Sequence, residues 1–181
     1  MNSVKTILVC GRPASGKTTI MKYIRDVFMP VYSELKYREL RFSQHGCTYM
    51  LGVFDGSITE GTDRLSMGVL PTALEFLGEL ETIRPTKRKL VFAEGDRLTN
   101  RTFIDKLLPS VYYITASEET LRGRHIRRNG GINETVFKAR KTKIENLARQ
   151  YRWPERINET ADDFNAIVND IINEGMNWIN G

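Results

Sequence analysis

Apolar residues along this chain gather in blocks, and three of these blocks are short and nearly continuous. They cover residues 6–10, 89–93 and 111–115 and are rich in Val, Leu, Ile and Tyr. Short apolar runs without polar alternation are typical of strands that are buried on both faces of a parallel sheet. The sequence therefore predicts a sheet with these three strands at its centre.

The segments between these runs carry apolar residues at helical spacing. In the first segment Ile20, Ile24 and Phe28 recur one turn apart until Pro30 ends the pattern. Similar patterns predict further helices at about 71–84, 100–108, 118–129, 134–151 and from 160 onward. Alternating strands and helices indicate an α/β fold, a mostly parallel sheet with helices on both faces in three layers (α/β/α). In such folds ligands bind at the carboxyl ends of the strands.

A different pattern follows the first helix. Residues 35–42 and 47–54 flank the turn-like sequence 43–46, which predicts a small β-hairpin, and residues 55–66 then form a polar loop. Four aromatic residues lie near the hairpin: Tyr32, Tyr37, Phe42 and Tyr49. They can stack on a nucleobase, but cross-strand packing is the more common role of such residues.

The composition limits the classes of protein that fit. The chain has 181 residues and 40% hydrophobic content, which suits one domain over residues 1–181. No apolar run approaches the roughly 18 residues that span a membrane, and the first strand begins too early for a signal peptide. Two cysteines, Cys10 and Cys47, are too few for a disulfide framework, so we expect a cytoplasmic protein. Two distant histidines argue against zinc.

The net charge of +5 is unevenly distributed. Residues 120–152 carry ten basic and two acidic side chains. One interpretation of this excess is a lid whose arginines hold phosphates, which accounts for about half of it. The other is such a lid together with a groove for a polyanion such as DNA or RNA. Both interpretations stay open at this stage.

The strongest motif follows the first strand. Residues 11–18 fit G-x-x-x-x-G-K-[ST], the phosphate-binding P-loop. Its glycines permit a tight turn whose N–H groups point at phosphate oxygens, next to the positive end of the following helix. Lys17 is then expected to reach the β- and γ-phosphates, and the Thr18 hydroxyl to bind Mg²⁺. The residues expected to hold the nucleotide are Gly11, Arg12, Pro13, Ala14, Ser15, Gly16, Lys17, Thr18 and Thr19.

Polar residues in two loops supply candidates for the rest of a phosphoryl-transfer site. In the first loop, Asp63 is a candidate base for an acceptor hydroxyl and Arg64 a candidate for positioning it. Helix capping by Asp63 is the alternative, and Asp55 is a weaker candidate base. After the second core strand, Glu94 is the candidate Mg²⁺ ligand, with Asp96 as the other possibility for that role.

Asp96 and Arg97 are also candidates for binding the acceptor. A capped loop with a local ion pair is the structural alternative for this segment.

Arginines are concentrated in the helix after Ser117. Arg124, Arg127 and Arg128 share one face, and Gly130-Gly131 behind them offers a hinge, so residues of about 117–135 are expected to form an Arg-rich lid. Arg124 and Arg128 would stabilise the transferring phosphoryl group and Arg127 would hold the nucleotide. A solvated basic helix face is the alternative, and it is the default for Lys138, Arg140, Lys141 and Lys143 on the next helix.

Taken together, the P-loop, the acidic loop after the second core strand and the Arg-rich segment resemble the small P-loop kinases of the nucleoside and nucleotide kinase superfamily. A narrower resemblance rests on three segments, residues 61–67, 94–98 and 141–146. They look like those of the tailed-phage P-loop kinases that phosphorylate 5-hydroxymethyluracil in DNA during thymidine hypermodification. This resemblance implies ATP and Mg²⁺ as cofactors and the hydroxymethyl oxygen of a base in DNA as acceptor, with the base leaving the stack to enter the pocket.

The chain departs from related patterns at two points. Thymidylate kinases typically have an aromatic residue after Asp-Arg, whereas Leu65 follows Asp63-Arg64 here, and no Asn-Lys-x-Asp guanine-reading motif is present. Two other functions therefore stay open: a kinase for free nucleosides or nucleoside monophosphates, and an NTP-driven switch without an acceptor. The preference for ATP or GTP and the oligomeric state are not determined by the sequence.

Overall fold

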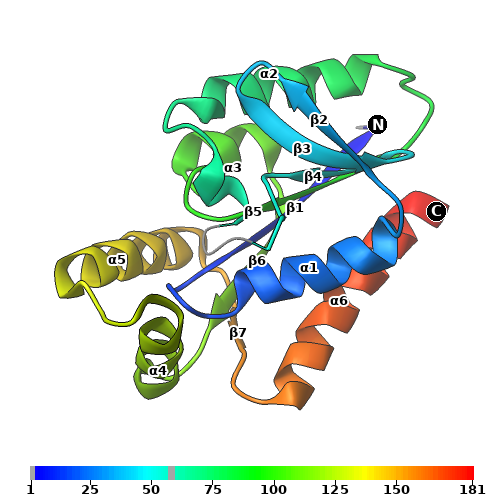
Figure 1. Ribbon diagram of the computed structural model, residues 1–181. Helices are drawn as coiled ribbons and strands as arrows, with labels where there is room; N and C mark the ends of the chain where they lie inside the picture. Colours follow the sequence, from blue (N-terminus) through cyan, green and yellow to red (C-terminus); the bar gives the residue numbers. More distant parts are fainter. Residues whose placement is uncertain (1–2, 57–59) are drawn as a thin grey trace.

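A seven-stranded sheet in the order β2-β3-β4-β5-β1-β6-β7 forms the centre of the fold (Figure 1). The computed structural model describes residues 3–56 and 60–181. The strands are β1 (Val4–Gly11), β2 (Ser33–Tyr37), β3 (Leu40–His45), β4 (Thr48–Leu51), β5 (Lys89–Glu94), β6 (Ser110–Thr115) and β7 (Glu155–Ile157). Strands β4, β5, β1, β6 and β7 run parallel, while β2, β3 and β4 pair antiparallel. The prediction of a mostly parallel sheet is confirmed.

Helices cover both faces of this sheet. They are α1 (Lys17–Phe28), the 3₁₀ helix η1 (Thr62–Arg64), α2 (Val69–Thr82), α3 (Arg101–Leu107), α4 (Glu118–Asn129), α5 (Glu134–Tyr151) and α6 (Ala161–Asn180). In Figure 1, α1 and α6 lie together on one side of the sheet, and α2, α3 and α5 lie on the other. Within the described residues this is the expected three-layer α/β/α arrangement.

Alternating side chains of β1 supply both halves of the core. Ile7 and Val9 pack with α1 and α6, whereas Leu8 and Cys10 pack with α2, α3 and α5. Successive side chains of a strand point to opposite faces of the sheet, so a strand that is apolar at every position needs a cover on each side. The continuous apolar runs in the sequence therefore correctly predicted that both faces of the sheet are covered.

The hairpin prediction is wrong in detail. Residues 33–51 form three antiparallel strands, with one turn between Tyr37 and Leu40 and another between His45 and Thr48. The first turn was missed because Arg38 adopts a φ of +51° without a Gly, Asn or Asp to signal it. The loop expected over residues 55–66 contains η1, and its residues 57–59 lie outside the described part of the chain.

The aromatic residues of these strands serve packing. Phe42 and Tyr49 are buried, and their rings pack against Phe76 of α2, as does the ring of Tyr37. Tyr32 is exposed, and the guanidinium of Arg25 lies over its ring. The packing interpretation is confirmed for the three residues that contact Phe76.

Helix α4 stands outside the three layers. Its only buried residue is Leu121, which forms a small cluster with Ala116 and Phe137. Ser117 caps its first turn, and Gly130 ends it with a φ of +72°, so its bounds match the helix predicted over residues 118–129. With Leu121 as its one buried side chain, α4 contacts the rest of the fold mainly through polar side chains, which suits the expectation that residues of about 117–135 form a lid. Separately, no helix among those described is long and apolar enough to cross a membrane.

Candidate functional site

The residues 11–18, here called the glycine-rich loop, connect β1 to α1 and require glycine at two places. Gly11 has a φ of +152°, and a β-carbon there would lie 2.0 Å from the carbonyl oxygen of Ile114. Gly16 has a φ of +92°, and a β-carbon would lie 2.5 Å from Nδ2 of Asn158. The two glycines of the motif therefore let the loop pass close to β6 and to the segment after β7.

The amino end of α1 carries no side-chain cap. Gly16 is its N-cap residue and offers no acceptor to the first N–H groups of the helix. Nearby, Nζ of Lys17 donates to the carbonyl oxygens of Gly11 at 3.2 Å and Arg12 at 3.0 Å. Uncapped amides and an ammonium that rests on carbonyls together form a site where an anion can bind.

Asn158 fastens the glycine-rich loop to the rest of the fold. Its Nδ2 donates to the carbonyl oxygen of Ser15 at 2.8 Å, and its backbone N–H donates to the carbonyl of Thr115. Its own carbonyl accepts from Nη1 of Arg124 at 2.8 Å. Asn158 is 4% exposed, so these bonds are shielded from water. This residue connects the loop, β6 and α4.

Two cavities open on the glycine-rich loop. The first, here called the α6-side cavity, has a volume of about 460 Å³ and is lined by Thr19, Arg124, Thr160 and Phe164 besides the loop. The second, the α5-side cavity, measures about 490 Å³. Its lining includes Gly11, Pro13, Glu60, Asp63, Glu94, Asp96, Arg97, His125 and Arg140.

The two cavities meet at the centre of the site. Ala14, Lys17, Thr18 and Arg128 line both of them. One molecule in each cavity would therefore face the same lysine, the same hydroxyl and the same arginine.

Glu94 lies at the end of β5, on the floor of the α5-side cavity. Its carboxyl group is 4% exposed, and burial, with Asp63 and Asp96 nearby, raises its pKa to about 7 although Lys17 and Arg128 act to lower it. Oε2 is buried and has no hydrogen-bond partner among the described residues. A buried carboxylate with a free oxygen is suited to binding a cation or a proton.

Asp63 and Asp96 are neighbours in the lining of the α5-side cavity. Oδ1 of Asp63 accepts from the backbone N–H of Asp96 at 3.3 Å, and Arg140 approaches both carboxylates, at 3.8 Å and 3.5 Å. Nζ of Lys143 donates to the carbonyl oxygen of Asp96. The second oxygen of Asp63 thus faces the cavity beside a guanidinium that can hold an anionic or polar ligand.

The donor set fits a magnesium ion that a phosphate brings with it. In residues 3–56 and 60–181, no three His, Cys, Asp or Glu side chains are grouped to hold a metal by themselves. Mg²⁺ in nucleotide sites takes most of its ligands from phosphates and water and one or two from the protein. Thr18 and Glu94 line the same cavity, and Glu94 has the unpartnered oxygen described above.

Most of the residues predicted from the sequence line one or both cavities. Those that do so are Gly11, Pro13, Ala14, Gly16, Lys17, Thr18, Thr19, Asp63, Glu94, Asp96, Arg97, Arg124 and Arg128.

Four predicted residues line neither cavity. The side chain of Arg12 turns away from the loop, and Ser15 is fully buried beneath it. Arg64 pairs with Asp55, and Arg127 is exposed, with Nε facing the carbonyl oxygen of Gly123. The structure thus does not bring these side chains to either cavity.

Sequence reasoning missed several lining residues. Glu60 is buried and pairs with Lys22 at 2.6 Å, and His125 and Phe164 were not considered as site residues. Arg140 was assigned by default to a solvated face. Helical spacing on α5 was the sequence signal for Arg140. Val136 and Arg140 lie one turn apart, and both line the α5-side cavity.

In comparisons with known proteins, neither a family model nor a curated protein sequence matches the chain.

Proposed function

We propose that this protein is an ATP- and Mg²⁺-dependent kinase that transfers the γ-phosphate to a hydroxyl group in the α5-side cavity. The observation that carries the proposal is the sharing of Lys17, Thr18 and Arg128 by two cavities. Phosphoryl transfer needs a donor and an acceptor on opposite sides of one phosphorus atom, with cations around it. A binding protein without an acceptor would need only one of the two cavities.

On the donor side, the triphosphate would lie along the glycine-rich loop and the first turn of α1. Lys17 would leave the carbonyls of Gly11 and Arg12 and donate to the β- and γ-phosphates. The base would occupy the α6-side cavity, where Phe164 offers a ring face and Arg124 a planar cation. Bound Mg²⁺, held by Thr18 and Glu94 directly or through water, would neutralise phosphate charge.

On the acceptor side, Asp63 would accept the proton of the attacking hydroxyl. The hydroxyl oxygen forms a bond to the γ-phosphorus, the bond between that phosphorus and the β,γ-bridging oxygen breaks, and ADP leaves. Arg97 and Arg140 would position the acceptor, and Arg128 would stabilise charge on the transferring group. Every group in this scheme lines one of the two cavities.

The acceptor that we propose is the hydroxymethyl group of 5-hydroxymethyluracil in DNA, with the base turned out of the stack. The resemblance of residues 61–67, 94–98 and 141–146 to phage kinases of that specificity supports it. The basic residues beside the α5-side cavity, Arg97, Arg140 and Lys143, support a polyanionic acceptor on independent grounds. A free nucleoside or nucleoside monophosphate would use the same catalytic groups without a contact to a DNA backbone.

The test supplies γ-labelled ATP with three acceptors in parallel: DNA containing 5-hydroxymethyluracil, matched ordinary DNA and free pyrimidine nucleotides. Label in the first DNA alone supports the proposal. Label in the free nucleotides instead assigns a nucleotide kinase, and release of inorganic phosphate alone assigns a switch. Retention of DNA should also weaken steeply as salt rises, because each phosphate contact releases a counterion.

A further inference from the structure

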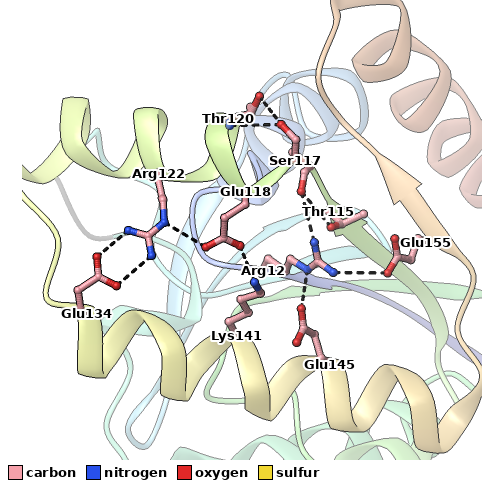
Figure 2. A network of polar contacts seen from close by, with 11 residues as sticks. Arg12, Thr115, Ser117, Glu118, Thr120, Arg122, Glu134, Lys141, Glu145 and Glu155 are labelled. Carbon is pink, nitrogen blue, oxygen red and sulfur yellow. Dashed lines mark hydrogen bonds and ion pairs between the residues drawn. The ribbon is translucent and has the colours of Figure 1, made fainter.

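The backbone and the side chain of Arg12 contact different parts of the molecule. Its carbonyl oxygen accepts from Nζ of Lys17 at 3.0 Å and from the N–H of Ser15 at 3.2 Å, while its N–H donates to the carbonyl of Ile114. Its guanidinium points the other way, out of the loop and toward α5 and β7 (Figure 2). The backbone of this residue therefore forms part of the resting place of Lys17, and its side chain contacts other elements.

The guanidinium of Arg12 joins three separate segments. Nε lies 2.9 Å from Oε1 of Glu145 on α5, Nη2 lies 3.7 Å from Oε1 of Glu155 on β7, and Nη1 donates to the carbonyl of Ala116 at 3.4 Å. The Arg12 side chain is 21% exposed and that of Glu145 is 27% exposed. Nε of Arg12 is buried and has no hydrogen-bond partner among the described residues, so its contact with Glu145 is an ion pair. Partial burial reduces screening of this pair by water, which makes it stronger than a fully exposed pair.

The same face of α5 also holds α4. Glu134, Lys141 and Glu145 are spaced by whole helical turns and lie along one stripe. Arg122 of α4 donates to both carboxylate oxygens of Glu134, at 2.6 Å and 3.0 Å, and to Glu118, which also accepts from Lys141 (Figure 2). One stripe of α5 thus carries two sets of charged contacts, one with α4 and one with the glycine-rich loop.

These two sets of contacts hold α5 against the two other elements that carry cations of the proposed site. Lys17 follows the loop, Arg128 lies on α4 and Arg140 lies on α5. We propose that Arg12 is a positioning residue, which fixes the glycine-rich loop against α5 and β7 so that these three cations meet at one phosphoryl group. The expected effect of Arg12 on turnover rests on the proposed function, whereas its effect on the structure of the glycine-rich loop does not.

Two consequences distinguish this role from direct phosphate binding. Binding of a triphosphate depends on the loop amides and the amino end of α1. Transfer also needs Lys17, Arg128 and Arg140 in the correct positions relative to one another. Loss of the Arg12 guanidinium should therefore lower turnover more than it weakens nucleotide binding. Loss of the Glu145 carboxylate should have the same effect, because it removes the other half of the contact, although Glu145 lines neither cavity.

The test compares Arg12→Met and Glu145→Gln with a matched control, Arg156→Met, which removes an ion pair with Asp170 on α6 and leaves the contact between Arg12 and Glu145 intact. The first readout is amide hydrogen exchange of residues 11–19 in the protein without nucleotide. We expect exchange to rise about tenfold or more in both test variants and to stay unchanged in the control. Arg12→Lys keeps the positive charge but loses the planar guanidinium group. It should therefore show exchange between that of the wild-type protein and that of Arg12→Met.

The second readout is kcat beside the Kd for ATP. We expect kcat to fall about tenfold to a hundredfold in both test variants, with the Kd changing less than about threefold. The proposal is overturned if Arg12→Met weakens ATP binding while Glu145→Gln leaves exchange and turnover unchanged, which is the behaviour of a phosphate ligand. It is also overturned if neither variant changes exchange. If the wild-type protein phosphorylates no acceptor, the proposed function fails, and exchange still decides the role of Arg12.

Discussion

The carboxylate of Glu94 lies against the α-carbon of Gly61, where a β-carbon on residue 61 would come within 2.0 Å of Oε2. Gly61 has a φ of +71° and a ψ of −148°, a region of backbone conformation that is open to glycine and closed to other residues. The floor of the α5-side cavity thus depends on a glycine two residues before Asp63. The loop that presents Asp63 and the strand end that presents Glu94 can approach only because that side chain is absent.

Gly61→Ala is expected to lower the free energy of unfolding by about 2–4 kcal/mol, because the new methyl group strains the backbone and displaces Glu94. Gly56→Ala is the matched control. Gly56 also has a positive φ, +86°, but a β-carbon there meets nothing within 4 Å, so the control should cost only about 1 kcal/mol. Urea unfolding of the two variants measures the difference, and equal losses would show that the contact with Glu94 is unimportant.

Lys17→Ala should abolish phosphoryl transfer, with a loss of about a hundredfold to a thousandfold or more. The ammonium is partly exposed, and within residues 3–56 and 60–181 it donates to loop carbonyls alone, so its removal should leave the unfolding transition nearly unchanged. Lys36→Ala, at an exposed position of β2, controls for the loss of a positive charge. Steady-state turnover and a thermal melt check the prediction, and near-normal turnover in Lys17→Ala would refute the role of the glycine-rich loop.

Asp63→Asn should lower kcat by about a hundredfold or more while the Kd for ATP stays within about threefold, because the side chain acts on the acceptor hydroxyl. Asn keeps the acceptor oxygen for the N–H of Asp96, so the local fold should survive. Asp170→Asn on α6 serves as the control, since Asp170 contacts Arg156 and lines neither cavity. An unchanged kcat would return Asp63 to a structural role.

His125 should report anion binding in the α5-side cavity. Burial and then the charges of Arg128 and Arg140 hold its pKa below the usual 6.5. Because the folded pKa is lowered, the neutral form stabilises the fold above pH 6.5, and this contribution is lost as the pH falls toward the folded value. NMR titration of the imidazole should show a higher pKa in Arg140→Met and after addition of ATP, since both reduce the positive potential. A pKa that stays fixed in both cases would contradict the assigned electrostatics.

The sequence predicted the layers of the fold because burial on two faces leaves a direct pattern. Continuous apolar runs marked β1, β5 and β6, and the helices predicted from about residues 118 and 160 begin there, after Ser117 and Thr160, whose side chains cap them. Strand β7 was missed because its three residues are exposed and carry no apolar pattern. Edge strands of this kind are determined by pairing with a neighbour, which no local rule encodes.

The candidate site was predictable where chemistry is local and not where it depends on distant contacts. Lys17 and Thr18 follow from the spacing of one motif. The direction of the Arg12 side chain depends on Glu145 and Glu155, which lie more than a hundred positions away in the sequence. Asn158 likewise acquires its role from a hydrogen bond to Ser15 across the fold. Such pairings arise from tertiary packing.

The fate of the γ-phosphate tests the central claim most directly. The measurement is a rapid-quench experiment with γ-labelled ATP, DNA containing 5-hydroxymethyluracil and either the wild-type protein or Lys17→Ala. The account predicts that label appears as a phosphomonoester on the modified base with the wild-type protein and that the variant transfers almost none. Release of the label as inorganic phosphate, with none in DNA or free nucleotide, would contradict it.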